Sequence, residues 1–100
     1  MHIIARPKLR EFQEKFSDAA ASLERWYTSC RENQFKNFPE LKLTFKAADL
    51  VGKCVVFNIR GNKYRLLVRV NFRAGRMWIK DFLPHREYDK LNLKGDARCS

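Results

Sequence analysis

The chain has 100 residues, and its 21 lysines and arginines against 11 aspartates and glutamates give a formal net charge of +10. This length suffices for one hydrophobic core but not for two, which predicts a single domain. No apolar run approaches the roughly 18 residues of a membrane-spanning helix, and the early cations Arg6, Lys8 and Arg10 are unlike a secretory signal. We therefore expect a cytoplasmic protein that has no membrane partner.

The first third of the chain predicts one short strand and two helices. The apolar start at residues 1–5 precedes Pro7, which suits the first turn of a helix. Ser17 or Asp18 is the expected cap of a second helix, which spans residues 19–32. Apolar residues recur at helical spacing in both segments: Leu9, Phe12 and Phe16 in the first, and Leu23, Trp26, Tyr27 and Cys30 in the second.

Residues 33–52 are expected to form a loop with a short helical turn, because Asn37 and Pro39 interrupt helices. After Gly52 the apolar period changes from helical to two. The segments KCVVFNI, KYRLLVRVNF and RMWIKDFL are joined by RGN and RAG, short glycine-containing links that are typical of antiparallel hairpins. Pro84 ends the third strand, residues 85–91 predict one or two helical turns, and residues 92–100 predict a flexible tail. The single domain would therefore span residues 1–91.

These elements predict an α+β fold of β-α-α-β-β-β order, with two helices packed on one face of an antiparallel-rich sheet and a short C-terminal helical turn. In the segment GNKYRLLVRVNF, alternate residues share the face that would pack under the helices: Tyr64, Leu66, Val68 and Val70. The cations Lys63, Arg65 and Arg69 would line the open face, since an antiparallel sheet can leave one face in water.

The three cysteines, Cys30, Cys54 and Cys99, are widely separated and include no CxxC pair, which fits neither a disulfide framework nor a zinc site. We expect all three to be reduced, with Cys30 and Cys54 filling the core. His2 and His85 are the only histidines, and no carboxylates cluster in the sequence. No metal or other cofactor is therefore expected.

The positive charge is concentrated in the second half of the chain. Residues 1–52 hold nine Lys/Arg and seven Asp/Glu, whereas residues 53–100 hold twelve and four, which gives net charges of +2 and +8. Such a basic half predicts a polyanionic partner. Because these cations lie on predicted strands and not on an amphipathic helix, nucleic acid is favoured over a membrane surface.

Two sequence blocks, FNIRGNKYRL and HREYDKL, together resemble the HigB family of bacterial toxins, which belongs to the RelE-like group of ribosome-dependent messenger RNA endonucleases. The likeness extends to MHIIARPKLREF and LERWY. It implies a RelE-like fold, cleavage of mRNA in the ribosomal A site, and neutralisation by a co-encoded HigA antitoxin with a helix-turn-helix domain. It also implies that DNA is bound only through the antitoxin complex. Pro84 departs from the family, whose members usually have threonine or another small residue before the histidine.

RNA cleavage without a metal requires a base for the 2′-hydroxyl proton, an acid for the leaving 5′ oxygen, and cations beside the phosphate. His85 can act as acid or base near neutral pH, Tyr88 could stack on a base or donate a proton, and Asp89 could orient His85 or an arginine. Arginine suits the phosphate because its planar fork can bind two oxygens. The expected catalytic residues are His85, Tyr88, Asp89, Arg65, Arg69 and Lys63, and the expected RNA contacts are Lys80, Arg60, Lys53 and Arg76.

Simpler interpretations stay open for some of these residues. Arg60, Lys53 and Arg76 fall at strand ends, where a solvated charge is the alternative role. The alternative function is a non-catalytic basic domain that binds RNA or the ribosome, which would need the cations but no His/Tyr/Asp set. A DNA-binding regulator is disfavoured because no helix-turn-helix pattern is present and the cations lie on strands.

Overall fold

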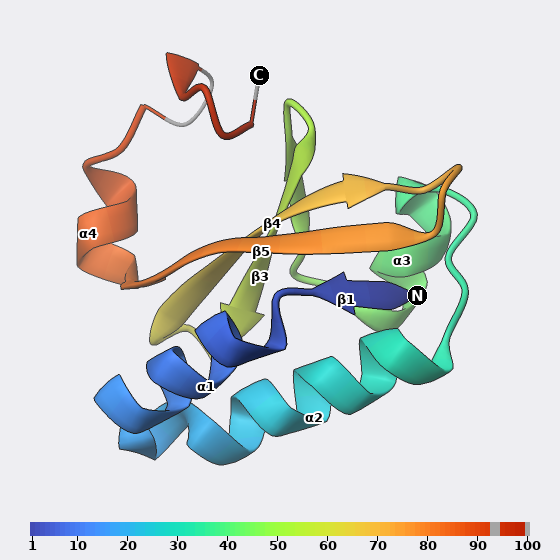
Figure 1. Cartoon of the computed structure of the whole chain (residues 1–100). Coiled ribbons are helices and arrows are strands. Elements are labelled where there is room, and N and C mark those ends of the chain that lie inside the picture. Colours follow the sequence, from blue (N-terminus) through green and yellow to red (C-terminus); the bar gives the residue numbers. More distant parts are fainter. Residues whose placement is uncertain (93–94, 100) are drawn as a thin grey trace.

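The structure is a computed structural model that describes residues 1–92 and 95–99. A five-stranded sheet forms its centre, with the strands in the order β1-β5-β4-β3-β2 (Figure 1). The strands are β1 His2–Ile4, β2 Asp49–Val51, β3 Cys54–Ile59, β4 Tyr64–Asn71 and β5 Arg76–Pro84. β3, β4 and β5 form the predicted antiparallel meander, while β1 pairs in parallel with β5.

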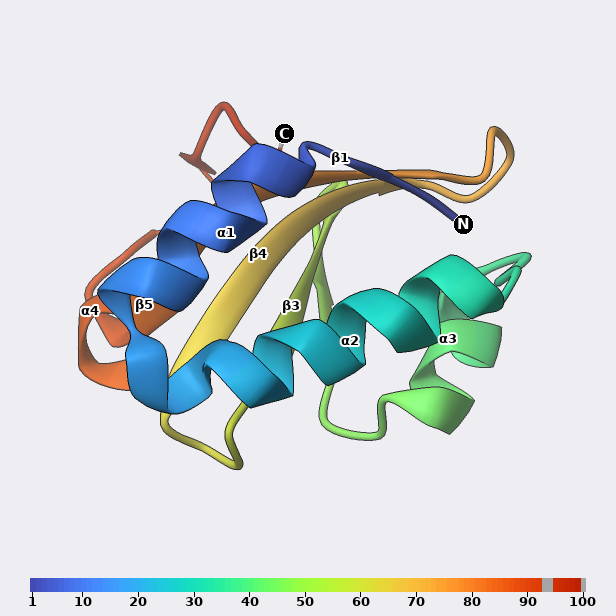
Figure 2. The same ribbon diagram turned by 60° about the horizontal axis from the view of Figure 1, so that its bottom comes forward.

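Three helices cover one face of this sheet, as Figure 2 shows: α1 Arg6–Lys15, α2 Ala20–Glu32 and α3 Phe38–Thr44. Pro7 lies in the first turn of α1, as predicted. A further short helix, α4 His85–Asp89, follows β5 directly. Among the described residues, no helix is both long and apolar enough to cross a membrane. The predicted α+β fold, with helices on one face of an antiparallel-rich sheet, is confirmed.

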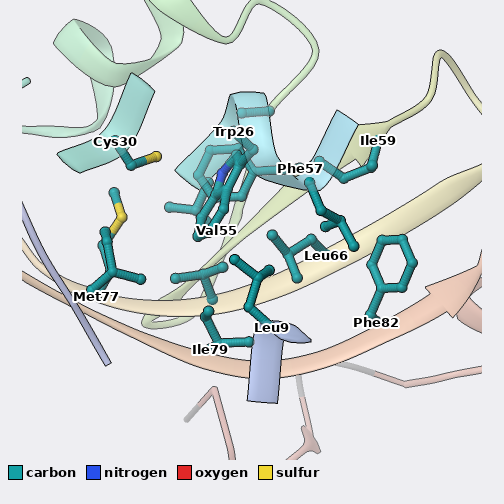
Figure 3. Close-up of a cluster of buried hydrophobic side chains, with 14 of the residues drawn as sticks. Leu9, Trp26, Cys30, Val55, Phe57, Ile59, Leu66, Met77, Ile79 and Phe82 are labelled. Atoms are coloured by element: carbon teal, nitrogen blue, oxygen red, sulfur yellow. The ribbon is translucent and has the colours of Figure 1, made fainter. Parts of the chain in front are cut away.

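The hydrophobic core lies between the helices and the sheet (Figure 3). Leu9 of α1, Trp26 of α2 and Leu66 of β4 are all buried there. Tyr64 and Val68 are buried on the same face of β4, which confirms the predicted alternation. Burial of a large apolar side chain contributes about 1.5–3 kcal/mol. The alternate apolar positions of β4 therefore determine which face of the strand turns toward the helices.

The segment expected to be a loop contains a complete helix and an edge strand. Asn37 caps α3, because its side chain accepts a hydrogen bond from the Glu40 amide at 2.9 Å, and Pro39 lies in the first turn. Asn and Pro disfavour the interior of a helix, but they favour its first positions. Because both residues lie at the start of α3, they begin a helix here where they were expected to interrupt one. The expected cap of α2 is also wrong. Ser17–Ala19 form a 3₁₀ turn, and α2 begins without a side-chain cap.

The cysteines also differ from the expectation. Cys54 and Cys99 form a disulfide, so the prediction that all three cysteines are reduced is wrong for this pair. The two residues are 45 positions apart in sequence, and only the folded chain brings their Cα atoms to 5.0 Å. Cys30 is a free, buried thiol, as expected, and burial raises its pKa to about 12.

The described part of the expected tail, residues 95–99, lies on the side of the sheet away from α1 and α2 (Figure 1). Cys99 is buried there, and Arg98 Nη1 lies 2.9 Å from Asp81 Oδ2 of β5. Residues 93, 94 and 100 lie outside the described residues, so the flexibility expected of residues 92–100 stays a prediction.

Candidate functional site

The sheet face opposite the helices carries the side chains of Arg65, Leu67 and Arg69, which alternate with the core residues of β4. Leu67 is fully buried in a second apolar cluster with Cys54, Val56 and Cys99. The cationic row expected on this face is therefore interrupted at its centre. Arg65 lies on one side of the cluster, opposite Asn58 and Leu83, and Arg69 lies on the other, opposite Cys54 and Trp78.

Helix α4 places His85 at the end of the sheet next to the β3–β4 turn. Pro84 ends β5 with φ −57° and ψ 148°, an extended conformation that leads directly into the helix. The His85 amide donates a hydrogen bond of 3.0 Å to the Lys63 carbonyl, which joins the start of α4 to the turn. The side chain of His85 is 41% exposed and can therefore meet a ligand from solvent.

Asp89 lies one helical turn after His85, on the same side of α4. Its Oδ2 atom is 3.6 Å from His85 Nδ1. This separation is longer than a hydrogen bond, but it places the carboxylate beside the imidazole. Asp89 is thus placed to act through His85, which is one of the two roles considered for it.

Tyr88 packs against the second apolar cluster, on the same face as Arg65. Its burial raises the pKa of the phenol, the negative charge of Asp49 raises it further, and Arg65 opposes the change. The hydroxyl therefore keeps its proton at neutral pH and can donate a hydrogen bond or a proton.

Asp49 is a site residue that the sequence did not reveal. Asp49 pairs with Val56 in the sheet. Val51, two residues further along β2, packs against the same cluster as Tyr88. Alternation along a strand places Asp49 and Val51 on one face. The only sequence signal for it was the order Asp-Leu-Val. That segment was expected to be a loop, and side chains alternate between two faces only in a strand.

Arg65 is held in place by neutral groups. Its guanidinium donates to Asn62 Oδ1 at 2.6 Å, to the Asn62 carbonyl at 3.1 Å and to the Tyr64 carbonyl at 3.2 Å. Within the described residues it forms no ion pair with a carboxylate, so its full charge remains to bind an anion. This combination of fixed position and unpaired charge suits a phosphate.

Lys63 and Arg60 are drawn away from Arg65 toward the helices. Both approach Asp18 of the 3₁₀ turn, with Lys63 Nζ at 2.5 Å and Arg60 Nη1 at 2.6 Å from Oδ2. The Tyr64 hydroxyl donates to the other oxygen at 2.8 Å. Hydrogen bonds from Lys63 and Tyr64 hold the pKa of Asp18 down to about 2. Asp18, expected to cap a helix, instead connects the β3–β4 turn to the helical layer.

The other predicted RNA contacts are scattered over the sheet. Lys80 lies at a β-bulge, because Leu67 pairs with Asp81 while Val68 pairs with Ile79. Arg76 begins β5, eight residues before Pro84, which at about 3.3 Å per residue is on the order of 25 Å from α4. Lys53 precedes β3 near Cys99, also at the far end. The structure thus brings Arg65, His85, Tyr88 and Asp89 together, and leaves Lys53 and Arg76 apart from them.

Residues 19–91 match a family model of HigB toxins, described as the RelE-like toxic component of a toxin-antitoxin system. The chain belongs to the HigB toxin family. This confirms the resemblance seen in the two sequence blocks, and the α+β architecture is consistent with a RelE-like fold. The matched residues include every candidate site residue from Asp49 to Asp89. A toxin of such a system has an antitoxin as its partner.

Curated HigB proteins match almost the whole chain. The "mRNA interferase HigB" of Escherichia coli O6:H1 is 31% identical over 94 residues, which cover 91% of each chain. The "mRNA interferase toxin HigB" of Escherichia coli K12 is 29% identical over 92 residues, which cover 89% of this chain and 88% of the relative.

In the part of the chain that the structure describes, no three His, Cys, Asp or Glu side chains come together as metal ligands would. A concavity of about 540 Å³ lies on the helical side of the sheet, and no residue of α4 lines it.

Proposed function

We propose that this HigB-family toxin is an endoribonuclease that cleaves translated mRNA in the ribosomal A site and so inhibits translation and growth. The observation that carries the proposal is the gathering of Arg65, His85 and Tyr88 at one end of the open sheet face. The names of the relatives, which are mRNA interferases, support the same reaction. The toxin would act in the cytoplasm, and its antitoxin would be of the HigA type, with a helix-turn-helix domain.

The reaction needs no metal in this mechanism. The RNA 2′ oxygen loses its proton to a base and bonds to the adjacent phosphorus, while the bond from phosphorus to the 5′ oxygen breaks and that oxygen gains a proton. His85 and Tyr88 share these two proton transfers. The side chain of His85 is exposed to solvent, and Asp89 Oδ2 lies 3.6 Å from its Nδ1 atom. Tyr88 carries its proton at neutral pH, since burial raises its pKa above the usual value.

Arg65 stabilises the phosphate as its charge grows. A positioned donor of this kind acts best when it does not have to reorganise during the reaction. The three hydrogen bonds that Arg65 makes to Asn62 and Tyr64 hold the guanidinium in place beforehand. Arg69 and Lys80 lie further along the same strands and would attract the RNA backbone without contacting the reacting phosphate.

Single-turnover cleavage of a message on programmed ribosomes tests this proposal. His85→Ala should slow cleavage by at least ~10²-fold, because a general acid or base contributes ~10²–10⁴-fold. Ribosome affinity should stay unchanged. His2→Ala is the matched control, since His2 is exposed on β1 at the other end of β5. A protein that binds ribosomes but leaves the message intact, or equal rates for both histidine variants, would instead identify a non-catalytic binding domain.

A further inference from the structure

Strand β3 extends beyond the strand that covers its outer edge. β2 pairs with the first half of β3, from Val51 opposite Cys54 to Asp49 opposite Val56. Residues 57–59 pair with β4 on their other side. Within the described residues, no strand pairs with the outer edge of residues 57–59. This edge presents backbone N–H and C=O groups that another extended chain could complete.

A groove runs along this free edge, on the helical side of the sheet. One cavity of about 540 Å³ lies between α2, the end of α3 and the β3–β4 turn. A second, of about 420 Å³, continues along the loop of residues 45–48. The two cavities share Phe45, Asn58 and Gly61, so they form one continuous depression. We call it the β3-edge groove.

The walls of the β3-edge groove combine an apolar floor with positive charge. The floor is formed by Trp26, Phe45, Phe57 and Ile59. Within the described residues, the unpaired cations are Arg25 and Lys46, while Arg60 is paired with Asp18. None of the residues that line the two cavities is an aspartate or a glutamate. Arg25 donates to the Ser22 hydroxyl and has no carboxylate partner in the described part of the chain. The groove therefore favours a negatively charged occupant with apolar side chains.

We propose that the β3-edge groove docks an extended, acidic segment of the antitoxin, which adds a strand beside residues 57–59 in line with β2. This proposal rests on membership of the toxin family and not on the nuclease activity. RNA fits the groove less well, because its backbone cannot form a strand ladder. A second copy of this chain also fits poorly, because its net charge of +10 would meet Arg25 and Lys46.

The geometry places the docked segment away from the reacting groups. The groove is built on the helical side of β3, whereas Arg65 and Tyr88 project from the opposite face. Antitoxin in the groove would therefore leave His85 and Tyr88 uncovered.

Charge reversal on α2 tests the docking site. The probe is the purified antitoxin encoded beside the toxin gene, and its dissociation constant is measured by calorimetry. Arg25→Glu should weaken binding by at least ~10-fold, because like charges across an interface are strongly unfavourable. Arg31→Glu is the matched control: it makes the same change on an exposed residue of the same helix that does not line the groove, and binding should change less than ~2-fold.

Amide hydrogen exchange adds a measurement at the strand itself. In the complex with the antitoxin, backbone amides within residues 57–59 should exchange at least ~10-fold more slowly than in the free toxin. Unchanged affinity of Arg25→Glu, or protection confined to the face of Arg65 and Tyr88, would overturn the proposal. Protection of residues 57–59 by a short RNA in place of the antitoxin would identify an RNA groove and also overturn it. Cleavage by Arg25→Glu should equal that of the wild type, so failure of docking and failure of the nuclease mechanism are separate results.

Discussion

Replacing Arg65 by alanine tests whether one positioned guanidinium, and not the overall positive charge, stabilises the reacting phosphate. The hydrogen bonds of 2.6 to 3.2 Å to Asn62 and Tyr64 use only neutral acceptors. The guanidinium therefore has a fixed position and an unpaired charge before RNA arrives. A preorganised donor to a developing oxyanion contributes ~10²–10³-fold in rate, and we expect Arg65→Ala to slow single-turnover cleavage on programmed ribosomes by this factor.

Further variants separate the position of this group from its charge. Arg65→Lys keeps the charge but loses the planar fork, so its rate should lie between those of the wild type and Arg65→Ala. Asn62→Ala removes the 2.6 Å hydrogen bond that orients the guanidinium. Because a hydrogen bond to a charged group contributes about 1.5–3 kcal/mol, this variant should cleave at least ~10-fold more slowly with unchanged charge.

The control for Arg65→Ala is Lys36→Ala, which removes one positive charge from an exposed loop before α3. It should leave the cleavage rate unchanged. Ribosome affinity is measured for every variant, so that a loss of binding is not mistaken for a loss of chemistry. If Lys36→Ala slows cleavage as much as Arg65→Ala, only the overall charge matters and the assignment of Arg65 is wrong.

Three further predictions concern the whole molecule. Affinity for ribosomes or RNA should fall steeply as the salt concentration rises, because each neutralised phosphate adds about 0.7–0.9 to the slope of log K against log salt concentration. An affinity that does not change with salt would contradict binding through the basic residues 53–100. The folded pKa of Asp18, lowered from 3.8 to about 2, means that its contribution to stability is complete above pH 4 and is lost as the pH falls from about 4 to 2. In urea unfolding, the free energy of unfolding of Asp18→Asn should fall less between pH 4 and pH 2 than that of the wild type. The same fall in both proteins would argue against the contacts of Asp18 with Lys63 and Tyr64. Reduction of the Cys54–Cys99 disulfide, which joins residues 45 positions apart, should lower the free energy of unfolding by about 2–4 kcal/mol. Cys99→Ser should show no response to dithiothreitol, and equal unfolding midpoints for the oxidised and reduced wild type would contradict the disulfide.

Features that depend on local periodicity could be predicted from the sequence. The alternation of Tyr64, Leu66 and Val68 indicated both the strand and its buried face, because side chains in an extended chain point to opposite sides in turn. The spacing of Leu23, Trp26 and Cys30 indicated a helix with one buried side for the same kind of reason. The blocks FNIRGNKYRL and HREYDKL indicated the family, which the comparison confirmed.

Features that join distant parts of the chain could not be predicted in this way. The parallel pairing of β1 with β5, the approach of Asp18 to Lys63, and the position of Asp49 beside Tyr88 all depend on how the layers pack. The Cys54–Cys99 disulfide belongs to the same class, since nothing in the spacing of the cysteines indicated a pair. Local conformational preference acts over a few residues, whereas each of these contacts closes a loop of tens of residues. Only the burial of the shared core between sheet and helices selects which distant residues meet.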